Sequence, residues 1–149
     1  MNTTPKNDGF SDRERTAMKE RAAELKADGK TRRGAAKAAA DEKKVRETIA
    51  KMDPDDRALA ERIHTVVTRV APQLAPKVWY GQPAYAIDGT VVCFFRSGKK
   101  DRERYSIFGF TQEAALDDDS GAWATSFALT HLSSAAEQRL TKLIEQAVT

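Results

Sequence analysis

Hydrophobic residues are distributed very unevenly along the chain. Of its 27 Leu, Ile, Val and Phe residues, 25 lie between residues 45 and 149, and residues 1–44 contain only Phe10 and Leu25. A folded core depends on burying such side chains, because apolar burial is the dominant favourable contribution to folding. The pattern therefore predicts one globular domain over residues 45–149 and a polar, basic helical extension over residues 1–44.

Within the extension, the pattern predicts one helix followed by a linker. Ser11 and Glu14 have the spacing of a capping box, which places the start of a helix at Ser11. Met18 and Leu25 share one face of that helix, but so thin an apolar stripe predicts weak docking or a free-standing helix. Lys26 to Arg46 is highly charged and contains no aromatic residue, so we expect a mobile linker that its alanines make partly helical.

Helical periodicity returns at the start of the domain and again at its end. We expect a short helix through Val45, which stops at Asp53-Pro54, where an aspartate can cap a second helix and proline fits the first turn. The second helix should end before Pro72, and a last helix should begin near Ser133 or Ser134. Their core-facing residues are predicted to be Leu59, Ile63, Val66, Val67 and Val70 in the second helix, and Ala136, Leu140, Leu143, Ile144 and Ala147 in the last.

Between these helices, the apolar period changes to two, which is typical of strands. Asp88-Gly89 between apolar runs predicts a two-residue hairpin with Ile87 opposite Thr90 and Tyr85 opposite Val92. That register places Tyr85, Ile87, Val92 and Phe94 on one face, and Ala84, Ala86, Val91, Cys93 and Phe95 on the other. Since both faces are apolar, helices, a partner or a ligand must cover the second face.

Two further strands are predicted at Tyr105–Phe110 and Trp123–Leu129, which completes four. The predicted fold class is α+β, with an antiparallel four-stranded meander flanked by N- and C-terminal helices.

Charge divides the chain at nearly the same place as hydrophobicity. The net charge is +3, but residues 1–50 carry 13 Lys and Arg against 9 Asp and Glu, while residues 51–149 carry 12 against 13. Basic side chains gain affinity for nucleic acid by releasing phosphate counterions. The arm is therefore either a solvated linker or a contact for nucleic acid or an acidic protein, with Arg32, Arg33, Lys43 and Lys44 as the candidate residues.

Several classes of protein find no support in the sequence. The longest apolar run, Val91 to Phe95, is too short for a membrane span, and the N-terminus lacks the apolar stretch of a signal peptide, so we expect a cytoplasmic protein without membrane contact. The single cysteine, Cys93, is expected to be an inert core thiol. The common nucleophile, phosphate-loop, dinucleotide and zinc-protease motifs are absent, so a binding protein is favoured over an enzyme.

A run of residues in the middle of the chain resembles a known family. Pro76 to Tyr85 (PKVWYGQPAY), followed by Asp88-Gly89 and Val91 to Phe95, is similar to the YdhG-like family of bacterial domains of unknown function, over about residues 45–149. The resemblance implies a frataxin-like α+β arrangement, and one member of that family is described as an iron chaperone. It carries over no catalytic residue. The motif positions Trp79, Tyr80, Gly81, Pro83 and Tyr85 are either core packing or the rim of a pocket.

Iron as a ligand would need hard oxygen donors, which two acidic clusters supply. The first is Asp53, Asp55, Asp56 and Glu61 at a helix start, where acidic residues also complement the helix dipole without a metal. The second is Asp117, Asp118 and Asp119, which also suit a solvated turn. His64 and His131 are expected to pack or cap rather than to bind metal.

The sequence therefore predicts a small cytoplasmic, non-enzymatic binding protein, monomeric or a small homo-oligomer. The leading expectation is iron, or an iron-accepting protein, as the partner. The alternative is an interaction module that binds nucleic acid or protein through the basic arm.

Overall fold

The computed structural model describes residues 12–149, and the side chains of residues 13–26 and 32–149. The chain divides into two compact units, residues 1–37 and residues 38–149. Helix α1 (Asp12–Ala50) runs through the first unit and supplies the first turns of the second. The helix cap predicted at Ser11 lies outside the described residues.

Helix α1 is continuous, so the linker predicted over Lys26 to Arg46 and the separate short helix after it are wrong. The segment is rich in alanine, the best helix former, and Arg46 donates to Glu42 one turn earlier at 2.8 Å. Every described side chain from residue 13 to residue 40 is exposed, including Met18 and Leu25. Local propensity and the ion pair between Arg21 and Glu24, 3.3 Å apart, therefore support this part of α1 without a buried apolar face.

Helices α2 (Pro54–Val70) and α3 (Ser134–Ala147) confirm the predicted periodicity. Helix α3 begins where predicted, and the Ser133 hydroxyl caps it by accepting a hydrogen bond from the Ala136 N–H at 3.2 Å. Asp53 precedes Pro54 at the start of α2, but its side chain makes no capping bond. Their buried side chains are Asp56, Leu59, Ala60, Ile63, His64, Val66 and Val67 in α2, and Leu140, Ile144 and Ala147 in α3.

The sheet is antiparallel and its strands follow one another in chain order. Its strands are β1 (Ala75–Trp79), β2 (Gln82–Ile87), β3 (Thr90–Arg96), β4 (Ser106–Phe110) and β5 (Ser126–Leu129). The α+β class is confirmed, but the sheet has five strands rather than four. β1 was missed because Ala75-Pro76-Lys77 shows no apolar alternation, and β5 is shorter than predicted because Trp123 lies exposed before it.

Two hairpins of the same kind connect the first three strands. Asp88 and Gly89 have φ values of 50° and 83°, which confirms the predicted two-residue turn between β2 and β3. Tyr80 and Gly81 form an equivalent turn between β1 and β2, with φ values of 50° and 73°. The second turn escaped prediction because tyrosine seldom adopts positive φ.

A β-bulge changes which side chains face the helices. Ile87 pairs with Thr90 as predicted, but Tyr85 pairs with Cys93 instead of Val92, because the register shifts between Tyr85 and Ala86. An extra residue in one strand reverses the alternation beyond it. The predicted faces are therefore wrong beyond the bulge: Phe94 lies with Ala84 on the outer face, while Val92, Cys93 and Phe95 belong to the main core.

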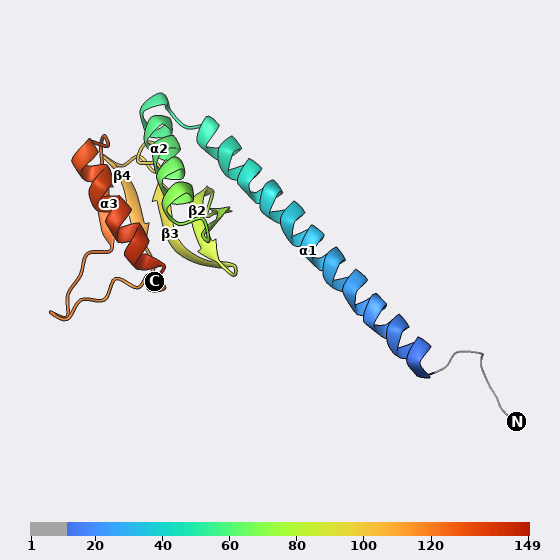
Figure 1. Ribbon diagram of the computed structural model, residues 1–149. Coiled ribbons are helices and arrows are strands. Elements are labelled where there is room, and N and C mark those ends of the chain that lie inside the picture. Colours follow the sequence, from blue (N-terminus) through green and yellow to red (C-terminus); the bar gives the residue numbers. More distant parts are fainter. Residues whose placement is uncertain (1–11) are drawn as a thin grey trace, which may run out of the picture. The chain divides into compact units, whose positions relative to one another are not determined.

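The main core lies between one face of the sheet and helices α2 and α3, which cover that face (Figure 1). Arg62 and Glu137 join these two helices by a bidentate ion pair. On the outer face, Trp79 and Phe94 pack over the small residues Ala84, Ala86 and Val91, with ring centroids 5.4 Å apart. The rings of the domain itself therefore shield the second apolar face.

A lysine-rimmed pocket as the candidate functional site

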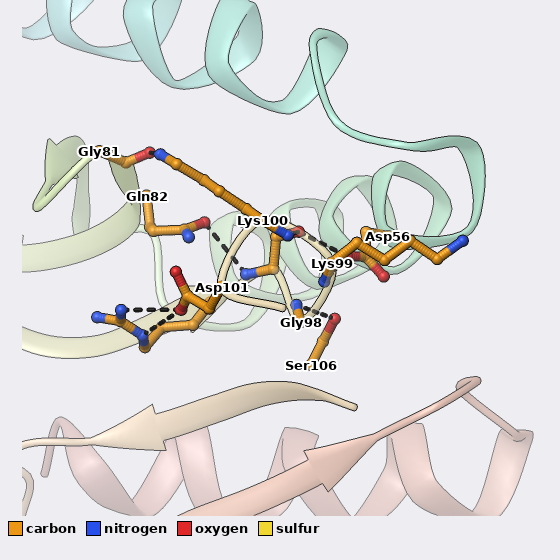
Figure 2. A network of polar contacts seen from close by, with 10 residues as sticks. Asp56, Gly81, Gln82, Gly98, Lys99, Lys100, Asp101 and Ser106 are labelled. Carbon is orange, nitrogen blue, oxygen red and sulfur yellow. Dashed lines mark hydrogen bonds and ion pairs between the residues drawn. The ribbon is translucent and has the colours of Figure 1, made fainter. Parts of the chain in front are cut away.

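The start of α2 is tied to the loop that connects β3 to β4. Asp56, in the first turn of α2, is 6% exposed and accepts hydrogen bonds from the Ser97 hydroxyl at 2.5 Å and the Lys99 backbone N–H at 3.0 Å (Figure 2). Burial raises the pKa of this carboxyl, but the hydrogen bonds from Ser97 and Lys99 outweigh it, so the pKa lies below its ordinary value. A charged Asp56 therefore fixes the loop against the helix.

The same loop is held from its other side. The Gly98 N–H donates to the Ser106 hydroxyl at 3.0 Å, and Arg96 donates to Asp101 at 2.9 and 3.1 Å (Figure 2). A Cβ at Gly98 would lie 2.4 Å from the Tyr105 carbonyl oxygen, so this crossing needs glycine. The backbone of residues 97–101 thus has a defined position.

Gln82, the first residue of β2, connects this loop to the sheet. Its side chain is buried, with 2% exposed, and its Oε1 accepts a hydrogen bond from the Ser97 N–H at 3.1 Å (Figure 2). The Nε2 group is also buried but has no hydrogen-bond partner among the described residues. Because buried amide groups are normally satisfied, this donor is an exception that calls for an explanation.

Gln82 lies in the wall of an open pocket of about 470 Å³. The pocket is lined by Thr48, Lys51, Met52, Asp53, Gly81, Gln82, Ser97, Lys99 and Lys100. The Lys100 ammonium donates to the Gly81 carbonyl at 2.8 Å, and its side chain extends toward Gly81 past Gln82 (Figure 2). The Lys99 ammonium lies 3.6 Å from an Asp55 carboxylate oxygen. The pocket wall therefore contains three lysines and the residue that carries the buried amide donor.

A second, smaller cavity of about 370 Å³ lies beside His64 on α2. The His64 Nδ1 is 2.9 Å from the Tyr85 hydroxyl, and its Nε2 is 3.6 Å from a Glu42 carboxylate oxygen. Burial lowers the pKa of His64, and Arg46 adds to this, while Glu42 opposes it. His64 is therefore neutral near pH 7 and serves as the buried hydrogen-bond partner of Tyr85.

The acidic residues considered for iron do not converge. Asp56 is buried in the loop network, Asp53 lines the lysine-rimmed pocket, and Glu61 lines the cavity beside His64. The aspartates at 117–119 lie exposed between β4 and β5, where the Ser120 hydroxyl donates to Asp118. In the part of the chain that the structure describes, no three His, Cys, Asp or Glu side chains form a group that could hold a metal ion.

The aromatic motif is divided between core and surface. Tyr85 is fully buried, Trp79 is half-buried, and Tyr80 is 79% exposed at the hairpin turn. Pro83 is buried at the entry to β2, where a missing N–H is tolerated. Of the five motif candidates, Gly81 alone lines the lysine-rimmed pocket.

The pocket depends mainly on residues that the sequence did not single out. Gln82 stands between the motif residues Gly81 and Pro83, and Lys99 and Lys100 belong to none of the candidate sets. An available signal was the polar Gln82 at the entry of an otherwise apolar strand. The contact between that residue and a loop 15 positions away depends on the fold.

The remaining candidate residues lie on the surface of α1, in the core and after β5. Arg32, Arg33, Lys43 and Lys44 are exposed on α1, and the members of each consecutive pair project about 100° apart around the helix. Cys93 is a buried core thiol as predicted, and burial raises its pKa to about 12. His131 is exposed after β5, beside Thr130.

Comparisons of the chain with family models, with characterised proteins and with solved structures give no match. Among the described residues, no helix combines the length and the hydrophobicity needed to cross a membrane.

Proposed function

We propose that the protein is a non-enzymatic binding protein for nucleic acid and that α1 is its binding element. The observation that carries this proposal is a basic line along the exposed part of the helix. Arg15, Lys19, Lys26, Arg33 and Lys37 follow one another at intervals of 4, 7, 7 and 4 residues. At 3.6 residues per turn, these positions fall within an arc of about 40°.

Three acidic residues in the part of the helix that carries the basic line lie on another side. Glu14, Glu20 and Glu24 project about 120° or more from its centre, on the side of the helix that also carries Arg21. The line is about 33 Å long at 1.5 Å per residue, close to one turn of a DNA duplex. An elongated row of cations on a solvated helix suits the regularly spaced charges of a phosphate backbone.

The proposal requires no aromatic residue on the arm, since backbone contacts are independent of base sequence. The expected ligand specificity is accordingly low. The YdhG-like resemblance, with iron as its implied partner, remains an expectation that rests on the sequence motif.

Salt dependence tests the proposal. Five phosphate contacts give a slope of about −4.5 for log K against log salt on duplex DNA, or a loss of roughly 500-fold between 50 and 200 mM salt. Fluorescence anisotropy of a labelled 20-base-pair duplex, with the full chain titrated in, measures both quantities. Repeating the titration with a single strand and with an acidic peptide of equal charge then compares the affinities for the possible partners.

Two variants of equal charge separate the basic line from general electrostatics. Changing Lys19, Lys26 and Arg33 to Gln removes three charges from the line, while the control changes Arg13, Arg21 and Arg32 on the other side of the helix. The line variant should lose about 2.7 units of slope, and the control should lose much less. Equal losses, or no binding of the parent at 50 mM salt, would contradict the proposal.

A further inference from the structure

We propose that the lysine-rimmed pocket binds a small oxyanion, the carboxylate or phosphate group of a metabolite, through the Gln82 side-chain amide and the surrounding lysines. This site is separate from the basic line on α1 and belongs wholly to the unit formed by residues 38–149. Its ligand class follows from the hydrogen-bonding needs and the charge of the pocket wall.

The Gln82 amide has one allowed orientation in this network. The Ser97 N–H is a donor, so the atom that faces it at 3.1 Å must be the carbonyl Oε1. The Nε2 group then carries two N–H donors that no described group accepts, although the side chain is 98% buried in the pocket wall. A buried donor without an acceptor is costly, and an oxyanion in the pocket would supply the acceptor.

The charge around Gln82 selects an anion over a cation or a neutral acceptor. Lys51, Lys99 and Lys100 line the pocket together with one acidic side chain, Asp53, and the Lys99 ammonium also lies 3.6 Å from an Asp55 carboxylate oxygen. Among the described residues, Lys51 has no ion-pair partner, and the Lys100 ammonium donates to the neutral Gly81 carbonyl. Ammonium groups beside N–H donors stabilise carboxylate or phosphate oxygens and repel metal ions.

The dimensions and the walls of the pocket indicate a ligand larger than an isolated ion. Its volume of about 470 Å³ lies within the range of small-molecule sites. Met52 and the aliphatic lysine stems offer apolar contact beside the charged groups. An anionic metabolite with a short apolar portion fits both features.

The defined loop explains why the donors are already in position. Asp56 binds the Lys99 backbone at 3.0 Å, and the Ser97 hydroxyl accepts from the Lys100 N–H at 3.2 Å. Both lysines therefore start from a fixed backbone, which reduces the ordering cost of binding.

NMR titration of the ¹⁵N-labelled full chain tests the proposal directly. Inorganic phosphate and citrate are added separately at constant ionic strength, with chloride as the reference anion. The Gln82 side-chain NH₂ signals should shift and saturate with one of the two probes, and not with chloride. The probe that saturates first distinguishes a phosphate site from a carboxylate site.

Gln82→Glu removes the donors but keeps an oxygen for the Ser97 N–H, so the loop contact survives. It should weaken binding of that probe by at least about tenfold. Gln138→Glu makes the same charge change on the exposed surface of α3 and should leave affinity unchanged. If Gln82→Glu fails to fold, the pair Lys51→Gln and Lys99→Gln gives the same test with the amide in place.

Three results would overturn the proposal: no saturable shift at Gln82 up to millimolar probe, shifts confined to α1, or equal losses in Gln82→Glu and Gln138→Glu. The Lys19, Lys26 and Arg33 variant should retain the pocket shifts. Failure of the pocket proposal and failure of the nucleic-acid proposal are therefore distinguishable.

Discussion

Replacing Asp56 by Ala should destabilise the domain by about 3 kcal/mol or more. The carboxylate accepts two hydrogen bonds, from the Ser97 hydroxyl and the Lys99 N–H, and each bond to a charged group is worth about 1.5–3 kcal/mol. Asp56→Asn keeps an acceptor oxygen but loses the charge, so its cost should be about half as large. Asp55→Ala is the matched control, because its 83% exposed side chain contributes at most about 0.5 kcal/mol. Urea unfolding at pH 7 measures all three.

The contribution of Asp56 to the free energy of unfolding should also depend on pH, in a defined direction. The pKa of Asp56 is lower in the folded protein than its ordinary value of 3.8, so the unfolded chain takes up the proton first as pH falls. The stability that the charged carboxylate provides is complete above pH 3.8. It is lost as the pH falls below 3.8 and passes through the pKa of Asp56 in the folded protein. The difference between the parent and Asp56→Asn should therefore be constant from pH 7 to 5 and shrink toward pH 3. A constant difference down to pH 3, or equal costs for Asp56→Ala and Asp55→Ala, would refute this reasoning.

Deleting residues 1–37 should leave the unfolding of the domain cooperative in a thermal melt, since the buried residues of α1 begin at Val45, and a broad transition would contradict this. Gly81→Ala should lower the free energy of unfolding by about 1 kcal/mol or more, and by more than Gly89→Ala does, as measured by urea unfolding. Both glycines have positive φ, but only a Cβ at Gly81 would meet the Lys100 ammonium, 2.7 Å away. Burial lowers the pKa of His64, so the contribution of this residue to stability should be complete above pH 6.5 and fall as the pH drops below that value. Replacing His64 with Gln should therefore flatten the pH dependence of stability between pH 5 and 7. An unchanged profile would count against a buried neutral imidazole.

The parts of the fold that follow from short-range patterns were predictable from the sequence. The apolar spacing of α2 and α3, the start of α3 beside Ser133 and the Asp88-Gly89 turn depend on residues within a few positions of one another, and all are confirmed. The continuity of α1 was not predicted because the high charge of Lys26 to Arg46 is typical of a linker, whereas its alanines favour a helix. Helix propensity alone favours the observed structure there.

The errors in the sheet have a different cause. The bulge beside Tyr85 is set by packing across strands and leaves no local signal, yet it reverses the predicted faces of β3. The pocket was missed for a related reason, because Gln82 and Ser97 meet only after β2 and β3 have paired in the correct register. The sequence motif includes Gly81, which lines the pocket, but no local pattern shows that Gln82 has a buried amide without an acceptor.

The two edges of the sheet determine how the domain behaves at high concentration. β1 is an edge strand, and it contains Pro76, which offers no N–H, and Lys77, whose charge opposes burial against another chain. β5 at the opposite edge is only four residues long. Neither edge presents a long, flat row of unpaired backbone groups, so addition of a strand from a second copy is disfavoured. The sheet is thus protected against growth into fibrous aggregates at both ends.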